Sequence, residues 1–214
     1  MVIKREDREE ILQYLTMDRY TSGEKIAKNL GLTRTSVWKG INRLRQKGFI
    51  VEAHPKKGYI LKGYPDRLYP FVIKMKLNNK LFGRKIFFFQ DIDSTNRLAK
   101  KLAMEGEEEG AIIIAEYQRE GKGRLNRQWI MPQEKGILFS VIFRPKLFPN
   151  EAFRLTMLTS VAIAKAIKQE LGLDSWIKWP NDIYIRDKKI SGILTEFSAE
   201  QDQIRYAIVG AGIN

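Results

Sequence analysis

Apolar residues in the first fifty positions recur at helical spacing and predict three short helices. The second predicted helix follows a candidate N-cap, Ser22, and ends at Gly31, and Thr33 is a candidate N-cap for the third. Two helices joined by a short turn that contains a glycine form a helix-turn-helix, which we therefore expect here. The residues expected to face inward are Ile3, Ile11, Leu12, Leu15, Ile26, Ala27, Leu30, Val37, Ile41 and Leu44.

Two strand-like runs follow, FIVE at 49–52 and GYIL at 58–61, and their hairpin would make the helix-turn-helix a winged one. The outward face of the third helix and the hairpin turn supply side chains that suit phosphates and base edges in the major groove. A three-helix module for protein contacts is the alternative, but the basic outward face favours DNA. The candidate DNA-binding residues are Arg34, Thr35, Ser36, Lys39, Asn42, Arg43, Lys56 and Lys57.

From residue 64 onward, apolar runs of strand length outnumber helical patterns. Pro65 and Pro70 argue against a continuing helix and indicate a linker and connecting segment over 64–82. Many strands and few helices predict an α+β sheet domain at 83–214, after a DNA-binding domain at 1–63. Strands are expected at 86–90, 111–115, 137–143 and 204–209, two more within 183–197 around a tight turn at 187–189, and helices after Ser94 and over 152–171.

Composition removes several classes of chemistry. The chain has no cysteine and one histidine, so disulfides, thiolate chemistry and a histidine-rich zinc site are excluded. The net charge is +13, and residues 1–63 carry 14 Lys and Arg against 7 Asp and Glu, which favours a nucleic-acid partner for that part. The charged start is unlike a signal peptide and no apolar run approaches a membrane span, so we expect a soluble cytoplasmic protein with no membrane partner.

A basic, glycine-containing loop, EYQREGKGRLNRQW at 116–129, carries the strongest single signal for chemistry. Its glycines permit close backbone approach, and its cations can converge on one anion. Trp129 ends the loop with an aromatic face. These features favour a phosphate-bearing, adenylate-like ligand, and a solvated basic loop is the alternative.

Four other motifs each have a plain structural interpretation beside a functional one. DSTN at 93–96 is a helix cap or a polar-ligand site, and KWPND at 178–182 is a β-turn or a source of oxygens for a metal or an amine. Lys189 is an exposed hairpin lysine or a residue that reaches a pocket. GAGIN at 210–214 is a plain loop or a place of close backbone approach to a ligand.

Taken together and in this order, DSTN, EYQ-x-x-GKGR-x-x-R-x-W, KWPND, KKISGI and GAGIN resemble the biotin–protein ligases. With a winged helix in front, the chain is similar to the bifunctional members that also repress the biotin operon. The resemblance implies a mixed-sheet catalytic domain of the class II aminoacyl-tRNA synthetase/biotin ligase type. It also implies that ATP and Mg²⁺ convert biotin to biotinyl-5′-AMP, and that biotin then passes to a lysine of the biotin carboxyl carrier protein of acetyl-CoA carboxylase. The adenylate would act as co-repressor and promote a homodimer that binds operator DNA.

The resemblance also implies roles for individual residues. Biotin-binding residues would be Ser94, Thr95, Asn96, Gln118, Lys122, Gly123, Arg124 and Lys189. ATP- or adenylate-binding residues would be Arg127, Trp129, Asn181 and Asn214, with magnesium near Asn181. Catalytic residues would be Lys189, Arg124, Arg127 and Asp182.

The chain departs from the family pattern at three places. The loop reads GKGR where GRGR is usual, so Lys122 keeps the charge but loses the bidentate fork of arginine. Glu120 adds a negative charge beside an anion site, and the chain stops at Asn214, where we expect the catalytic domain to be incomplete. Two alternatives therefore stay open: a DNA-binding regulator that senses biotin or its adenylate without turnover, and a lipoate ligase, against which KWPND, KKISGI and the winged helix argue.

Overall fold

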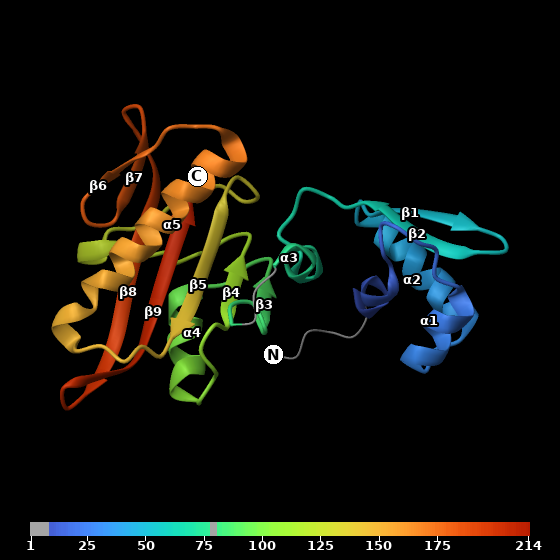
Figure 1. Cartoon of the computed structure of the whole chain (residues 1–214), viewed down its shortest axis with the longest axis horizontal. Helices are drawn as coiled ribbons and strands as arrows, with labels where there is room; N and C mark the ends of the chain where they lie inside the picture. The colour runs from blue at the N-terminus through green and yellow to red at the C-terminus, as the bar shows by residue number, and fades with distance from the viewer. Residues whose placement is uncertain (1–8, 78–80) are drawn as a thin grey trace. The chain divides into compact units, whose positions relative to one another are not determined.

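The computed structural model describes residues 9–77 and 81–214, which form two units that divide between Arg67 and Leu68 (Figure 1). The first unit contains two helices, α1 (Gly23–Leu30) and α2 (Arg34–Gln46). The side chain of Ser22 accepts a hydrogen bond from the backbone N–H of Lys25, and the side chain of Thr33 accepts one from Ser36. Both predicted caps are confirmed, and Gly31 ends α1 with a φ of 63°, a left-handed conformation that suits glycine.

The described part of the first predicted helix is wound more tightly than an α-helix. It is a 3-10 helix over Glu9–Tyr14, and Leu15 N–H donates to the carbonyl of Leu12, three residues back. Ile11, Leu12 and Leu15 are buried as predicted, whereas Ile3 lies outside the described residues. The predicted helix and its buried face are therefore present in the described residues. The sequence left the type of helix open, because apolar spacing over six residues does not separate a 3-10 helix from an α-helix.

The wing is a two-stranded antiparallel hairpin of β1 (Ile50–His54) and β2 (Gly58–Gly63). Arg45 joins it to α2, since its Nε and one terminal nitrogen donate to the carbonyl of Val51 at 2.9 and 2.7 Å. The predicted winged helix-turn-helix is therefore present.

The second unit is built on a seven-stranded mixed sheet in the order β3-β4-β5-β9-β8-β7-β6. Only β3 and β4 pair in parallel, and the other neighbours are antiparallel, which confirms the α+β prediction. The strands are β3 (Ile86–Phe89), β4 (Ile112–Ala115), β5 (Ile137–Phe143), β6 (Trp176–Lys178), β7 (Asp182–Ile185), β8 (Lys188–Glu200) and β9 (Gln203–Ile213). A helix, α3 (Pro70–Lys76), begins with Pro70 inside the segment predicted as a connection, because proline is well suited to the first turn of a helix.

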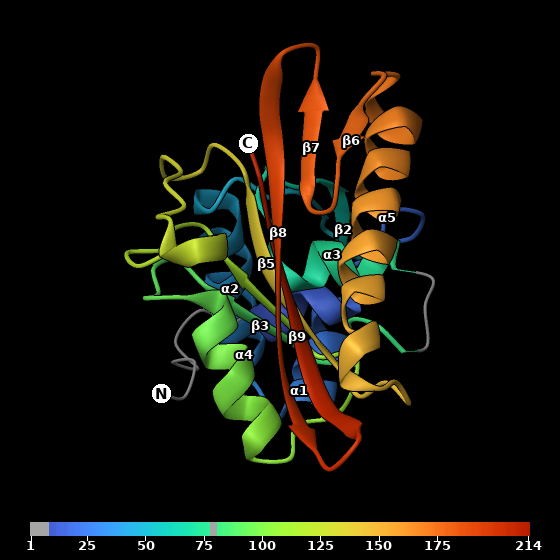
Figure 2. The same cartoon turned by 90° about the vertical axis from the view of Figure 1, so that its left-hand side faces the viewer.

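Two further helices cover opposite faces of this sheet, α4 (Thr95–Met104) on one side and α5 (Phe153–Leu171) on the other (Figure 2). Alternate residues of β9 divide between them: Tyr206 and Ile208 pack with α4, whereas Ala207 and Val209 pack with α5. Two 3-10 turns, Arg124–Asn126 and Pro149–Glu151, complete the unit.

Two sequence-based boundaries need correction. The tight turn predicted at 187–189 lies instead at Arg186 and Asp187, because Ile185 pairs with Lys188 across a two-residue connection. Lys189 is therefore a strand residue of β8. Residues 210–213 are not a loop but the end of β9, where Gly210 and Gly212 are paired with both β5 and β8.

Candidate functional site

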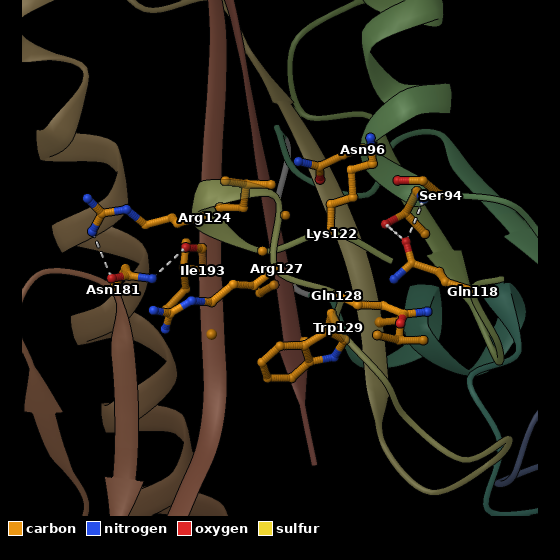
Figure 3. Close-up of a pocket in the computed structure, with 18 of the residues that line it drawn as sticks. Ser94, Asn96, Gln118, Lys122, Arg124, Arg127, Gln128, Trp129, Asn181 and Ile193 are labelled. Atoms are coloured by element: carbon orange, nitrogen blue, oxygen red, sulfur yellow. Dashed lines mark hydrogen bonds between the residues drawn. The ribbon is translucent and has the colours of Figure 1, made fainter. Parts of the chain in front are cut away.

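A pocket of about 640 Å³ lies on the α4 side of the sheet, between the N-terminus of α4, the basic loop and the ends of β8 and β9. Its lining includes every residue that the sequence predicted for the ligand site: Ser94, Thr95, Asn96, Gln118, Lys122, Gly123, Arg124, Arg127, Trp129, Asn181, Asp182, Lys189 and Asn214. Motifs that are far apart in the chain thus surround one cavity (Figure 3). The roles of the single residues stay predictions.

Polar groups converge at the start of α4. Ser94 is the N-cap of the helix, and Gln118 follows β4 beside it in a parallel bridge with Ile92. The backbone N–H and the hydroxyl of Thr95 lie 2.7 and 2.9 Å from Gln118 Oε1, and both donate to it. This end of the pocket therefore holds a fixed set of short, uncharged hydrogen-bonding groups.

Two residues that the sequence did not single out complete this polar end. Ser140 of β5 lies 2.7 Å from the Thr95 hydroxyl and 2.6 Å from Asn96 Oδ1, and Asn96 Nδ2 donates to Glu196 Oε2 of β8 at 2.7 Å. Ser140 is fully buried. No sequence motif surrounds either residue, and only the pairing of β5, β8 and β9 brings them to α4.

The basic loop is held in a tight conformation by its own backbone. Gly123 N–H donates to the Arg127 carbonyl at 2.7 Å, and Trp129 N–H donates to the Gly121 carbonyl at 2.9 Å. A Cβ at Gly121 would lie 2.7 Å from the Trp129 carbonyl oxygen, so the loop needs glycine at that place.

The ring of Trp129 lies against the glycines of the two central strands. A Cβ on Gly192 would come within 2.8 Å of the ring, and one on Gly212 would overlap the ring around Nε1. The glycines of KKISGI and GAGIN thus make room for this side chain, and no described residue accepts a hydrogen bond from its buried Nε1. Lys189 Nζ lies 5.5 Å from the ring centre, within cation–π range.

Charged side chains gather at the other end of the pocket. Lys189 Nζ pairs with Asp182 Oδ1 at 2.8 Å. Arg124 donates to Asn181 Oδ1 at 3.0 Å (Figure 3). Asn181 is itself held, because its Nδ2 donates to the Ile193 carbonyl and to Asp182. Together with Arg127 these cations outnumber the one carboxylate of the lining, so this end favours an anion, whereas Lys122 extends toward Ser94 and Asn96 (Figure 3).

Glu120, the unexpected negative charge of the loop, has a partner on α4. Its Oε2 lies 2.6 Å from Arg97, whose other nitrogen lies 2.7 Å from Asp93 Oδ2. The hydrogen bond from Arg97 to Glu120, and then the one to Asp93, raise the pKa of Arg97. Burial acts to raise the pKa of Asp93, but the Ser94 N–H and Arg97 outweigh it, so that pKa falls below its usual value. Glu120 therefore joins the base of the loop to α4, and it is not part of the pocket lining.

A smaller hollow of about 370 Å³ adjoins the pocket and shares part of its lining with it. Arg97, Lys100 and Glu196 line this hollow but not the larger pocket. In the part of the chain that the structure describes, no group of three or more His, Asp or Glu side chains could hold a metal ion. Across 9–77 and 81–214, no helix is long and apolar enough to cross a membrane.

The predicted DNA-binding residues lie on α2 and on the turn of the wing. Those that are exposed are Arg34, Thr35, Lys39, Arg43, Lys56 and Lys57, whereas Ser36 and Asn42 are half-buried. Asn42 Oδ1 accepts from Arg45 at 3.1 Å, which leaves its amide nitrogen for a base. Trp38, which the sequence did not suggest, is 54% exposed on α2.

The chain therefore combines a winged helix-turn-helix unit with a mixed-sheet unit whose pocket favours an anionic ligand. The Biotin/lipoate A/B protein ligase family matches residues 88–214, and an HTH domain matches residues 7–60. The chain therefore belongs to the biotin/lipoate A/B protein ligase family.

Two similar proteins are named as bifunctional ligase/repressors. The chain is 39% identical over 197 residues to the bifunctional ligase/repressor BirA of Bacillus subtilis (strain 168), covering 92% of this chain and 61% of that protein. It is 34% identical over 206 residues to BirA of Escherichia coli (strain K12), covering 95% of this chain and 62% of that protein. The chain thus spans about three fifths of the length of these relatives.

A similar solved structure is the biotin protein ligase from Aquifex aeolicus in complex with biotin and ATP. The two are 33% identical with a TM-score of 0.52, and the match covers 61% of this chain and 52% of that one. The biotin protein ligase from Leishmania major in complex with biotinyl-5-AMP is 26% identical with a TM-score of 0.52, covering 61% and 57%.

Proposed function

We propose that this chain is the winged-helix and ligase part of an ATP-dependent biotin–protein ligase that also represses biotin-synthesis genes. The observation that carries the proposal is the pocket, which has uncharged hydrogen-bonding groups at one end and cations at the other. Biotin has the same polarity, with an uncharged ureido ring and an anionic carboxylate. Relatives named as bifunctional ligase/repressor and a ligase structure that contains biotin and ATP support the assignment.

The biotin ring would lie at the α4 end of the pocket, beside Ser94, Thr95 and Gln118. Its carboxylate would then point toward Arg124 and Lys189, and Lys122 would lie beside the ring. Arg127, Trp129, Asn181 and Asn214 would bind the nucleotide, because they line the remaining part of the pocket.

In the first half-reaction, a carboxylate oxygen of biotin attacks the α-phosphorus of ATP, and the bond to pyrophosphate breaks. This chain would act by bringing two anions together and by stabilising the charge that develops on phosphate, through Lys189, Arg124 and Arg127. In the second half-reaction, the neutral amine of a carrier lysine attacks the acyl carbon and AMP leaves. Asp182, which pairs with Lys189, would orient the ammonium group of Lys189 and the amine of the carrier lysine.

Magnesium would arrive with ATP and take most of its ligands from phosphate oxygens and water. Asp182 and Asn181 are the oxygen-bearing side chains nearest to the cations, but Asp182 is already paired with Lys189. These residues fit a contact to a nucleotide-bound magnesium, and they do not form a separate metal site.

Incorporation of labelled biotin into a purified carrier domain, with ATP and magnesium, tests the ligase. We expect Lys189→Ala to lower kcat/KM by about 10²–10³-fold, because it removes a cation from the developing charge. Lys188→Ala is the matched control, since Lys188 is the preceding residue of β8 and does not line the pocket.

Transfer by the parent and by Lys188→Ala, with loss in Lys189→Ala, would establish the ligase. Binding of biotin and ATP without any transfer would favour the second candidate, a regulator that senses biotin or its adenylate without turnover. The same assay on a longer chain, extended to the full length of the relatives, then separates a sensor from an incomplete ligase.

The repressor role predicts that biotin plus ATP strengthens DNA binding, by stabilising a homodimer that presents two wings to an operator. A ligand can do so only if it binds the dimer more tightly than the monomer. Sedimentation and mobility-shift measurements on DNA upstream of biotin-synthesis genes, with and without biotin plus ATP, check this. The proposed function belongs to the cytoplasm, where ATP is present. DNA affinity that is identical with and without biotin plus ATP contradicts the co-repressor mechanism.

A further inference from the structure

Five side chains form one continuous series of hydrogen bonds at the polar end of the pocket. In spatial order they are Gln118, Thr95, Ser140, Asn96 and Glu196, and they come from the segment after β4, α4, β5, α4 and β8. Thr95, Ser140 and Asn96 are each at most 9% exposed. Asn96 also packs directly on Gly210, where any Cβ would overlap its amide. The middle of the series is therefore buried, and Ser140 is the one member that lines neither cavity.

The two amide groups can take only one orientation each. The backbone N–H of Thr95 can only donate, so the Gln118 atom that faces it at 2.7 Å is the oxygen, and Gln118 Nε2 points away. No described residue accepts from that Nε2. The Glu196 carboxylate can only accept, so the Asn96 atom that faces it at 2.7 Å is the nitrogen, and Asn96 Oδ1 faces Ser140.

Two hydroxyl protons then serve three oxygen–oxygen contacts, of 2.6, 2.7 and 2.9 Å. The Thr95 hydroxyl donates to Gln118 Oε1, and the Ser140 hydroxyl donates toward both Thr95 Oγ1 and Asn96 Oδ1. The single proton of Ser140 therefore serves two acceptors, Thr95 Oγ1 and Asn96 Oδ1. Ser140 can donate to Asn96 only while the amide oxygen of Asn96 faces it, and Glu196 fixes that orientation by accepting from the Asn96 nitrogen.

We propose that Glu196, which fixes the Asn96 amide, and Ser140, which contacts both Asn96 and Thr95, are positioning residues for the ligand ring. The series leaves Thr95 Oγ1 as an acceptor and Gln118 Nε2 as a donor, side by side at the pocket. A ring that carries adjacent N–H and C=O groups, such as a cyclic urea, matches that pair. Asn96 then acts through Ser140 and Thr95, instead of binding the ligand itself as its motif suggests. This inference rests on the proposed function, because it assigns the biotin ring to this end of the pocket.

Loss of the carboxylate would free the Asn96 amide to rotate by 180°. Its nitrogen would then donate to Ser140, the Ser140 proton would go to Thr95 alone, and the contacts that position Thr95 and Gln118 at the pocket would change. Glu196→Gln keeps an oxygen that can accept from Asn96, whereas Glu196→Ala does not. Glu200→Ala is the matched control, since Glu200 is also an exposed glutamate of β8 and lines neither cavity.

Calorimetric titration of the 214-residue chain with biotin, and separately with ATP, tests the proposal. We expect Glu196→Ala to weaken biotin binding about tenfold, as for one buried hydrogen bond left unmade, and to leave ATP affinity within about twofold. Glu196→Gln should restore most of the biotin affinity, and Glu200→Ala should match the parent. Unchanged biotin affinity in Glu196→Ala overturns the proposal, and so does an equal loss for biotin and ATP, which would indicate a general structural effect.

A ligand-free measurement separates this inference from the proposed function. In ¹⁵N-resolved NMR spectra, Glu196→Ala should shift the side-chain amide signals of Gln118, which lies at the far end of the series, and Glu200→Ala should leave them in place. If the parent binds no biotin, the proposed function fails. If the Gln118 signals stay unchanged in Glu196→Ala, the coupling through the series is refuted, whatever the chain binds.

Discussion

Single residues at the pocket owe their identity to close approach between backbone and side chains. Trp129 occupies space that exists only because positions 192 and 212 lack a Cβ. Its ring also contributes the face near which Lys189 lies, so the ring and the ammonium group are placed together. A side chain added at one of these glycines should therefore displace the Trp129 ring and leave the strand pairing of the sheet intact.

We expect Gly212→Ala to destabilise the chain by about 1–3 kcal/mol, because an added methyl overlaps the Trp129 ring and forces it to move. In a Trp129→Ala background the same substitution should cost much less, since its neighbour is gone. Urea unfolding of the parent, the two single variants and the double variant gives the coupling free energy between positions 129 and 212. Additive effects of the two substitutions would show that the added methyl meets something other than the indole.

At the scale of an element, the recognition helix α2 depends on how it begins. Thr33 accepts from the Ser36 N–H, and its hydroxyl also donates to Ser36 Oγ at 2.9 Å. Thr35 is two positions further along and exposed, so its side chain has no such capping role. The two threonines thus separate the stability of the helix from its proposed contact with DNA.

Thr33→Ala should lower the unfolding free energy of α2 by about 0.5–2 kcal/mol through loss of the cap. Native-state hydrogen exchange of the Val37–Leu44 amides measures this locally. Thr35→Ala should leave the exchange unchanged and weaken DNA binding instead. Equal exchange rates in Thr33→Ala and the parent would argue against the cap as a source of stability.

At the scale of the whole molecule, the positive charge serves two proposed anionic partners, the nucleotide and DNA. The chain carries a net charge of +13, and the first 63 residues hold about half of the excess. Phosphate contacts release counterions, so each of them adds to the salt dependence of binding. Charge in the wing should therefore act on DNA affinity in a way that charge elsewhere does not.

Lys56→Ala should weaken binding to any DNA sequence and reduce the slope of log K against log salt by about one. Lys165→Ala is the control, because Lys165 is an exposed residue of α5, in the other unit. Mobility-shift titrations at several salt concentrations provide the slopes. A similar reduction in slope for Lys165→Ala would move the DNA contact away from the wing.

The amino-acid sequence by itself determined the features that depend on residues close together in the chain, such as helix ends and buried helix faces. Ser22, Gly31 and Thr33 identified helix ends because capping acts over three or four residues, and apolar periodicity identified the buried faces of α1 and α2. The ordered motifs also determined the family and the lining of the pocket. The apolar spacing of a short segment is shared by α-helices and 3-10 helices, so the 3-10 helix at Glu9–Tyr14 was predicted only as a helix.

Only the tertiary structure decided which distant groups meet. Asn96 and Glu196 are 100 residues apart, and their hydrogen bond exists because α4 packs beside β5, β9 and β8. The sequence showed Glu120 as a charge beside an anion site, but the direction of its side chain toward Arg97 depends on the backbone of the loop. Side-chain direction and strand order are set by packing of the whole unit, which no local window of sequence contains.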